Sequence, residues 1–202
     1  MAHALSGPEQ VLDLARRQGV VRPRDLRARG IHPETLRRLC ASGRMMRMGR
    51  GLYTLTDADH TEHLSLAEAA LRVPNGIACL ISALEYHGLG TQIAHEAWMM
   101  IDRRAHKPRV RRPPMRFVLA SGKALTEGVE KVTIEGVPVR ITNVPKTIAD
   151  CFRYRSHVGL DVALEALTEC LRQRRSTPGE LSDYAEICGV SSVMRPYIEA
   201  LA

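Results

Sequence analysis

The sequence predicts an α+β protein in which a small helical head precedes a larger body with a sheet of about four strands and flanking helices. Residues 8–56 show helical spacing of apolar residues, followed by a short stretch that alternates like a strand. Residues 97–141 contain apolar runs of strand length, and helical spacing resumes after Pro145. Because 202 residues suffice for two small domains, we expect one at residues 1–57 and a mixed α/β domain at residues 58–202.

Three short helices are expected in the head, because it contains three pairs of a residue that marks the start of a helix and a residue that marks its end. A proline suits the first turn of a helix, and a glycine commonly follows its last turn. Apolar residues at helical spacing occupy the intervals between the members of the pairs. The pairs are Pro8 and Gly19, Pro23 and Gly30, and Pro33 and Gly43, with His32 at the cap of the third helix.

A two-stranded hairpin is expected directly after the third helix. Gly49-Arg50-Gly51 has the composition of a tight turn, and apolar residues flank it over residues 45–48 and 52–55. Three helices followed by such a hairpin are the sequence outline of a winged helix-turn-helix, a module that places one helix in the major groove of DNA. We therefore predict an N-terminal winged helix-turn-helix domain that binds double-stranded DNA.

The third helix would contact DNA through the face opposite its apolar residues. At about 100° per residue, the positions farthest from those residues are Glu34, Arg38 and Ala41, and Thr35 and Arg37 flank them. Arginine can form a pair of hydrogen bonds to guanine, and threonine can contact a base edge or a phosphate. The alternative is that the arginines form a solvated surface, or that the module contacts protein. The predicted DNA-binding residues are Thr35, Arg37, Arg38, Arg44, Arg47 and Arg50.

Basic residues are concentrated in the head and in one segment of the body. Residues 1–57 hold eleven arginines and five acidic residues, whereas residues 103–116 hold seven basic residues and no acidic one. The second segment lies between two expected strands, and its prolines argue against a helix. It is either a solvated hairpin loop or an auxiliary phosphate clamp that adds nonspecific affinity. The phosphate contacts of such a clamp would be Arg103, Arg104, Lys107, Arg109, Arg111 and Arg112.

Along the sequence, the body is expected to have helices before the strands of its sheet and further helices after them. The helices before the sheet are expected at Leu64–Val73 and Ile77–His87. The strands are expected at Ala97–Ile101, Met115–Ala120, Val129–Ile134 and Val137–Ile141. The helices after the sheet are expected at Thr147–Tyr154, at Leu160–Arg172, from Thr177 onward and at Ser191–Leu201.

No arrangement of residues indicates catalysis. The sequence has neither a glycine-rich phosphate-binding loop nor a Gly-x-Ser-x-Gly motif. His60 and His63 have no cysteine close to them in the sequence, so we expect no metal site there. Asp102, Glu130 and Lys131 come nearest to a nuclease site, but the last two are adjacent and would point to opposite sides of a strand. We therefore expect a protein that is not an enzyme and uses no cofactor or metal.

The cysteines and the hydropathy indicate a cytoplasmic protein. The five cysteines include no C-x-x-C pair, which is typical of free thiols in a reducing compartment. No apolar run reaches the roughly 18–20 residues that cross a bilayer, and the N-terminus lacks the order of a signal peptide. We expect no contact with a membrane.

Three passages spread over nearly the whole chain resemble one known family. They are RMGRGLYTL at residues 47–55, ISALEYHGLG at residues 81–90 and VPKTIADCF at residues 144–152. They are similar to the basic wing, the Ser-Ala-Leu…His-Gly-Leu segment and the Pro-Arg-Thr-x-x-Asp segment of AbiEi-type antitoxins, with Lys146 where arginine is more usual. These antitoxins are the autorepressor half of type IV toxin–antitoxin systems, which occur in abortive-infection operons.

The resemblance implies that the head binds inverted repeats in the promoter of its own operon, with DNA contacts at Thr35, Arg37, Arg38, Arg47 and Arg50. It implies that the body opposes a cognate toxin with a nucleotidyltransferase fold, without requiring a stable complex. His87 and Asp150 match the family segments, and we expect both to be structural hydrogen-bonding residues. Two alternatives remain open: a solitary winged-helix regulator whose body senses a ligand or a protein, and a DNA-targeted nuclease.

Overall fold

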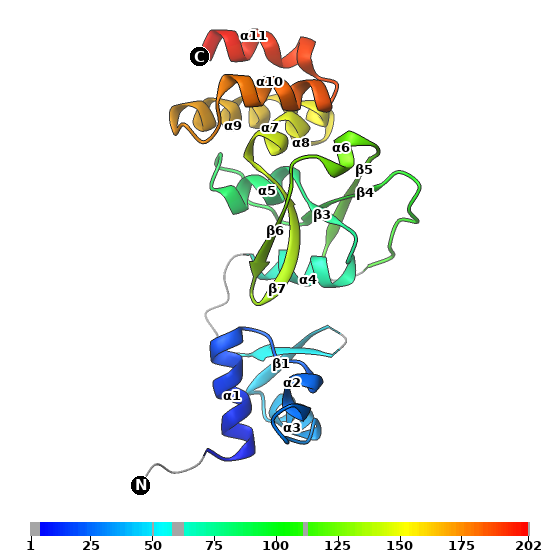
Figure 1. The fold of residues 1–202 in the computed structure, drawn as a ribbon, viewed down its shortest axis with the longest axis vertical. Helices are drawn as coiled ribbons and strands as arrows, with labels where there is room; N and C mark the ends of the chain where they lie inside the picture. The colour runs from blue at the N-terminus through cyan, green and yellow to red at the C-terminus, as the bar shows by residue number, and fades with distance from the viewer. Residues whose placement is uncertain (1–4, 50, 58–62, 111–112, 202) are drawn as a thin grey trace.

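The computed structural model describes residues 5–49, 51–57, 63–110 and 113–201, and its fold is α+β (Figure 1). The described residues form a two-stranded sheet near the N-terminus and a five-stranded sheet in the rest of the chain, both accompanied by helices. The predicted fold class is confirmed at this level. We name the described part of residues 5–57 the head and that of residues 63–201 the body.

Within its described residues, the head contains three helices followed by a hairpin, in the predicted order. The helices are α1 (Gly7–Gln18), α2 (Pro23–Arg27) and α3 (Glu34–Ala41), and the strands are β1 (Met45–Gly49) and β2 (Leu52–Leu55). The Ser6 N–H donates to the Glu9 carboxylate at 2.8 Å and closes the start of α1. α2 is shorter than predicted, because the N–H groups of Arg29 and Gly30 donate to carbonyl groups three residues earlier, as in a turn, rather than four residues earlier.

The helices and the hairpin of the head enclose a small apolar core. Val11 of α1, Leu36 of α3 and Met45 of β1 are buried in it. The link between α1 and α2 belongs to the same unit, because Val21 and Tyr53 exchange backbone hydrogen bonds of 2.8 and 3.0 Å. β2 therefore has β1 on one side and Val21 on the other.

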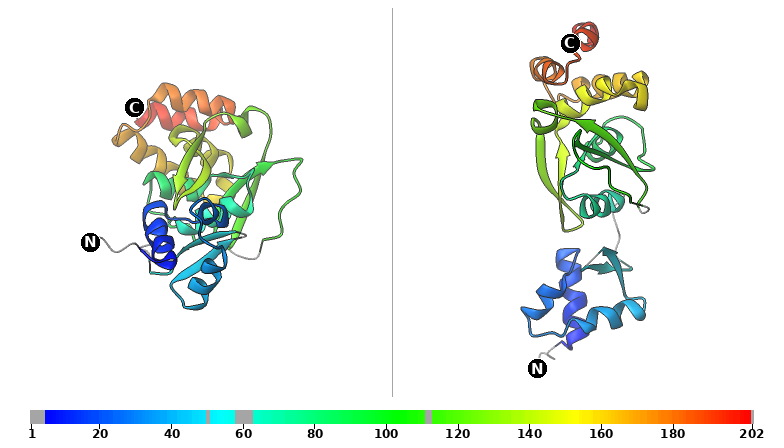
Figure 2. Two further views of the ribbon diagram at one scale, coloured as in Figure 1. Left: turned by 60° about the horizontal axis from the view of Figure 1, so that its bottom comes forward. Right: turned by 90° about the vertical axis from the view of Figure 1, so that its right-hand side faces the viewer.

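The body is built around one mixed sheet. Its elements up to the last strand are α4 (Leu64–Arg72), β3 (Ile77–Ala78), α5 (Leu80–His87), β4 (Ala97–Asp102), β5 (Met115–Ala120), α6 (Lys123–Thr126), β6 (Val129–Ile134) and β7 (Val137–Thr142). The helices that follow are α7 (Val144–Arg153), α8 (Arg155–Val158), α9 (Leu160–Arg172), α10 (Pro178–Ile187) and α11 (Ser191–Leu201). The head and α11 lie at opposite ends of the molecule (Figure 2).

The strand order is β5-β4-β3-β7-β6, and apolar clusters lie on both faces of the sheet. β4 and β5 are parallel, as are β3 and β7, whereas the other neighbours are antiparallel. Met99 and Ile101 of β4 pack in an apolar cluster with residues of α4, and Trp98 and Met100 pack in a second cluster with residues of α5 and α7. This split follows from the alternation of side chains along a strand.

The prediction of four strands was wrong, because the described part of the sheet contains a fifth strand, β3. It lies between β4 and β7 in a segment that was predicted as helix. The helix α5 begins only at Leu80, which has φ 49° after the extended residue Cys79. A strand of two residues has no periodicity of its own, and it forms because both neighbouring strands supply partners for its backbone.

Two short helices, α6 and α8, were not predicted, and α7 begins earlier than predicted. The expected start was Thr147, whereas α7 starts at Val144. The Asn143 side chain caps this helix, because it accepts a hydrogen bond from the Lys146 N–H at 3.1 Å, and Pro145 suits the first turn. The start signal is therefore present in the sequence, three residues before the place where apolar spacing becomes evident.

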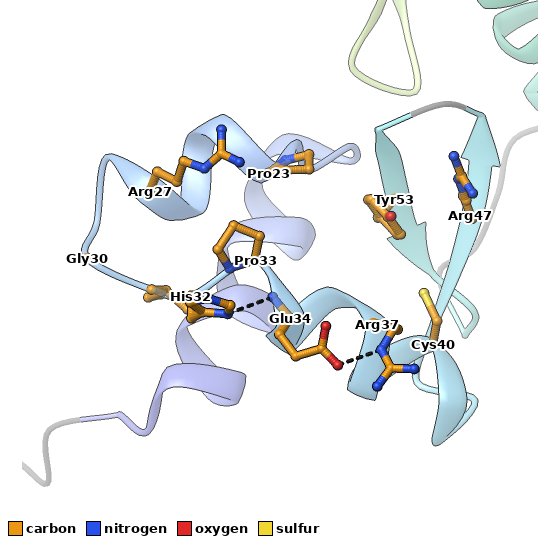
Figure 3. A pocket seen from close by; sticks show the side chains of 11 residues that line it. Pro23, Arg27, Gly30, His32, Pro33, Glu34, Arg37, Cys40, Arg47 and Tyr53 are labelled. Atoms are coloured by element: carbon orange, nitrogen blue, oxygen red, sulfur yellow. Dashed lines mark hydrogen bonds and ion pairs between the residues drawn. The ribbon is translucent and has the colours of Figure 1, made fainter.

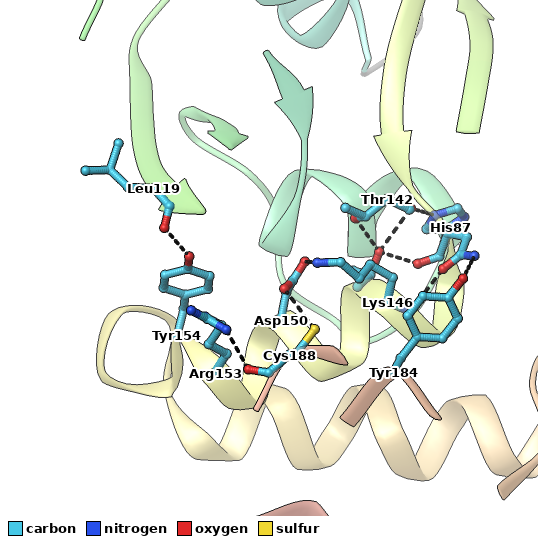
Figure 4. Close-up of polar contacts among 11 residues, drawn as sticks. His87, Leu119, Thr142, Lys146, Asp150, Arg153, Tyr154, Tyr184 and Cys188 are labelled. Carbon is cyan, nitrogen blue, oxygen red and sulfur yellow. Dashed lines mark hydrogen bonds and ion pairs between the residues drawn. The ribbon is translucent and has the colours of Figure 1, made fainter. Parts of the chain in front are cut away.

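The corner where β7 meets α7 is polar although it is buried (Figure 4). His87 Nε2 lies 2.7 Å from the Thr142 carbonyl oxygen. One turn into α7, Lys146 Nζ lies 2.5 Å from Asp150 Oδ2. The exposed fractions of the two side chains are 0% and 1%. The Cys188 thiol donates to the other oxygen of Asp150 at 3.4 Å. His87 and Asp150 thus make hydrogen bonds inside the body, as expected of structural residues.

Acidification below pH 6.5 should destabilise the protein through His87. Burial lowers the pKa of His87 from its ordinary value of 6.5. As the pH falls through 6.5, the unfolded chain takes up a proton that the folded protein still excludes, so the free energy of unfolding decreases. We expect H87Q, whose amide can keep the bond to Thr142, to lose less stability than the wild type between about pH 7.5 and pH 5.5 in urea unfolding. Equal losses in both proteins would exclude this role for His87.

Candidate nucleic-acid interface

α3 buries one side against the head and exposes the other. Leu36 and Leu39 are buried, whereas Arg37 and Arg38 are exposed. The Glu34 carboxylate accepts a hydrogen bond from Arg37 Nε at 2.5 Å, which directs the two terminal amino groups of that guanidinium away from Glu34. Two arginines of α3 are therefore presented to solvent on the side that the sequence predicted.

Thr35 does not share this exposure, and its predicted place on the outer face was wrong. Its side chain is buried, with an exposed fraction of 4%. The buried side of α3 is centred between Leu36 and Leu39, because Cys40 is only partly covered. Thr35 lies about 40° from Leu39 around the helix axis and falls within that buried side. Thr35 is therefore not on the exposed side of α3 that carries Arg37 and Arg38.

A groove of about 870 Å³ lies between α2, α3 and the β1–β2 hairpin (Figure 3). Arg27 of α2, Arg37 of α3 and Arg47 of β1 line it, and Tyr53 of β2 stands on the hairpin side. Guanidinium groups stay charged at physiological pH and bind phosphate oxygens through paired hydrogen bonds. Arginines from three separate elements thus form a concave basic surface suited to an extended anion.

Hydrogen bonds within the protein hold polar side chains at the groove. Arg47 Nε donates to the Gly49 carbonyl oxygen at 3.0 Å. The Glu34 N–H donates to His32 Nδ1 at 3.2 Å, as Figure 3 shows. Because Nδ1 is an acceptor there, the neutral His32 ring carries its proton on Nε2. The groove therefore offers an additional donor beside its guanidinium groups.

The structure brings together only part of the predicted set. Arg37 and Arg47 both line the groove. Arg38 and Arg44 are exposed but do not line it, and Arg50 lies outside the described residues.

Arg27, His32 and Tyr53 line the groove and were not among the predicted contacts. A sequence pattern can show that each of these residues lies near a helix or a strand, but it cannot show that their elements share one groove. The arginine content of α2 was the only available signal.

The basic segment of the body connects two parallel strands, so it is not a hairpin loop, which was one of the two alternatives for this segment. β4 pairs with β5 in parallel register from Ala97 and Met115 onward, and the segment therefore returns along the sheet as a crossover. Its described candidate residues are all exposed, whereas Arg111 and Arg112 lie outside the described residues. The exposed ones are Arg103, Arg104, Lys107 and Arg109.

The residues nearest to a nuclease site are not assembled. Asp102 ends β4, whereas Glu130 and Lys131 lie on β6 at the edge of the sheet, with β3 and β7 between these strands. Within the described ranges, no group of three histidine, cysteine or acidic residues is arranged to hold a metal ion. His60 lies outside those ranges. The five cysteines are all free.

No helix in the parts of the chain that the structure describes has both the length and the apolar composition for a membrane span.

Comparison with known proteins finds a family model that is similar to the head. No curated protein matches the chain. Residues 9–56 match the model of a family described as "Transcriptional regulator, AbiEi antitoxin". The match extends from α1 to the end of β2 and therefore includes every element that lines the groove, whereas residues 81–90 and 144–152 lie outside it. Residues 9–56 of this chain are therefore similar to the domain that this family model describes.

Proposed function

We propose that this protein is a DNA-binding repressor of its own promoter and the antitoxin of a type IV toxin–antitoxin system. In this proposal residues 1–57 form a winged helix-turn-helix domain, and residues 58–202 form the antitoxin domain. The observation that carries the proposal is the groove lined by Arg27, Arg37 and Arg47 inside the segment that matches the AbiEi family. No cofactor is required for binding of this kind.

The exposed side of α3 would enter the major groove of double-stranded DNA. Arg38 lies on that side outside the basic groove, and it would read a guanine. A phosphate backbone would pass through the groove between α3 and the hairpin, where Arg37 and Arg47 would contact it. Arg44 and Arg50 would contact flanking phosphates beside the hairpin.

Two copies would occupy the two halves of an inverted repeat, since a two-fold symmetric site matches a pair of identical proteins. Bound copies would block RNA polymerase. The exposed basic segment of the body would add salt-dependent phosphate contacts through Arg103, Arg104, Lys107 and Arg109, together with Arg111 and Arg112. The body would oppose a nucleotidyltransferase-like toxin in the cytoplasm, with or without a stable complex.

The groove is tested by the double variant R37A/R47A on DNA from upstream of the gene. We expect it to bind about 10- to 100-fold more weakly on any sequence, and to lower the slope of log affinity against log salt by about two, one for each lost phosphate contact. The matched control R172A/R195A removes two arginines from the far end of the body and should bind as the wild type does. Unchanged affinity and slope in R37A/R47A would contradict the groove as a backbone site.

The antitoxin role is tested by co-expression with a neighbouring nucleotidyltransferase-like gene. We expect the full chain to restore growth, and R37A/R47A to restore growth as well when both are expressed from the same foreign promoter. Failure of the wild type to restore growth would contradict the antitoxin role.

The second candidate is a solitary winged-helix regulator whose body senses a ligand or a protein. The family match favours it in one respect, because it stops at residue 56 and leaves the body unassigned. The absence of a toxin gene beside that of this protein, together with specific binding of the upstream DNA, would favour this candidate over the antitoxin.

A further inference from the structure

The tip of the β6–β7 hairpin meets the end of α1, and the two backbones touch without room for a side chain. Gly136 has φ 70°, and a Cβ atom on it would lie 2.2 Å from the Gln18 carbonyl oxygen and 3.2 Å from the Val20 nitrogen. From the other side, a Cβ atom on Gly19 would lie 3.2 Å from the carbonyl group of Glu135. Figure 1 shows the hairpin directed at the end of α1.

Apolar side chains of the head and the body pack together beside this contact. Val20 and Met48 of the head are buried, with exposed fractions of 6% and 2%. They belong to one apolar cluster with Ile134 and Val137, which flank the tip of the body hairpin, and Leu52 packs against the same cluster. Head and body thus share a core, which gives the contact a hydrophobic contribution as well as a close steric fit.

The segment that receives the hairpin tip is bonded to the strand that lines the groove. The Thr54 hydroxyl donates to the Gly19 carbonyl oxygen at 2.8 Å, and Val21 is paired with Tyr53 through two backbone hydrogen bonds. Tyr53 is in turn paired with Arg47 across the β1–β2 hairpin, and both residues line the basic groove. Residues 19–21 are therefore held by the body on one side and by β2 on the other.

We propose that the β6–β7 hairpin is a positioning element for DNA binding: through Gly136 it fixes residues 19–21 and β2, and thereby sets where Arg47 lies relative to α3. In this proposal Gly136 touches no DNA. It acts only through the β1–β2 hairpin of the head, which carries Arg47. The inference rests on the proposed function for its DNA readout. It adds that the body determines the geometry of the DNA-binding surface, so the head does not bind DNA independently of the body.

The test compares G136A with G189A in the full chain. Both glycines have positive φ, 70° and 68°, so alanine is strained at each, but no atom lies within 4 Å of a Cβ on Gly189. We expect G136A to weaken binding of upstream DNA about tenfold, within the range of couplings measured inside one contact network, while G189A binds as the wild type does. Small-angle X-ray scattering should show a larger radius of gyration for G136A only.

A double-mutant cycle with R47A separates positioning from general destabilisation. If the hairpin acts through Arg47, G136A should cost less than about threefold in the R47A background, because the contact that it misplaces is already absent. Equal penalties in both backgrounds, or wild-type affinity of G136A, would overturn the inference. If G136A does not fold, G19A replaces it in the same cycle. A Cβ atom on Gly19 would lie 3.2 Å from the Glu135 carbonyl group and so disturbs the same contact from the side of the head. The outcomes that support or overturn the inference are the same.

The proposed function and this inference fail in different ways. If the wild-type protein does not bind the upstream DNA, the proposed function is contradicted. In that case the radius of gyration of G136A still tests the contact between head and body, and an unchanged value would contradict it. Wild-type binding with an additive cycle would leave the proposed function in place and contradict only the positioning role.

Discussion

Replacing Asp150 by alanine should lower the free energy of unfolding by about 3–5 kcal/mol, the cost of leaving one partner of a buried ion pair without the other. Lys146 is completely buried, and its ammonium group lies 2.5 Å from Asp150 Oδ2. Burial raises the pKa of Asp150, and the neighbouring Lys146 acts in the opposite direction. Without the carboxylate, the Lys146 amine is left in the centre of the body with no partner of opposite charge, which is unfavourable whether the amine keeps its charge or loses it.

The control for D150A is an ion pair of the same spacing on the surface. Asp13 and Arg17 lie 2.9 Å apart on α1, also four residues apart, and their side chains are 36% and 75% exposed. We expect D13A to change stability by at most about 1 kcal/mol, as is usual for exposed pairs. The double variant K146M/D150L should lose less stability than D150A, because it leaves no unpaired charge. Urea unfolding measures all three, and a D150A change below about 1 kcal/mol would contradict this role for the pair.

Replacing Arg38 by alanine should abolish most of the preference for the operator over unrelated DNA. A well-formed pair of hydrogen bonds from arginine to guanine contributes about 1–3 kcal/mol of discrimination, or about 5- to 150-fold in affinity. Arg38 is exposed on α3 and does not line the basic groove, so its loss should affect specific binding more than nonspecific binding.

The control for R38A is R38K, which keeps the charge but cannot form the paired bonds of a guanidinium. We expect R38K to retain nonspecific affinity and to lose preference for the operator about as far as R38A does. The measurement is competition of operator DNA against shuffled DNA of the same length. A ratio of affinities equal to that of the wild type in R38A would show that Arg38 does not read a base.

The sequence predicted those elements whose signals are local. The helices of the head begin near prolines and end before glycines, and those residues act within a single turn. β3 was missed because Ile77 and Ala78 are extended only through their pairing with β4 and β7, which are distant in sequence. The parallel arrangement of β4 and β5 was missed for the same reason, since two apolar runs and a loop are also compatible with a hairpin.

The candidate site was predicted where one helix determines it. The exposure of Arg37 and Arg38 follows from the helical spacing of their neighbours. The burial of Thr35 depends on how the rest of the head covers α3, and the groove depends on the packing of α2, α3 and the hairpin against one another. Neither is encoded in the spacing of residues along a single element.

In the proposed function, the head recognises a specific DNA sequence through α3 and the adjoining basic groove. It is tested most directly by titrating the wild-type protein into labelled DNA from upstream of its gene and into a shuffled duplex of equal length and composition, at physiological salt. We expect at least about 10³-fold tighter binding of the upstream DNA, the lower end of the range for specific recognition, with protection of both halves of an inverted repeat in a footprint. Equal affinity for the two duplexes, with no protected region, would contradict it.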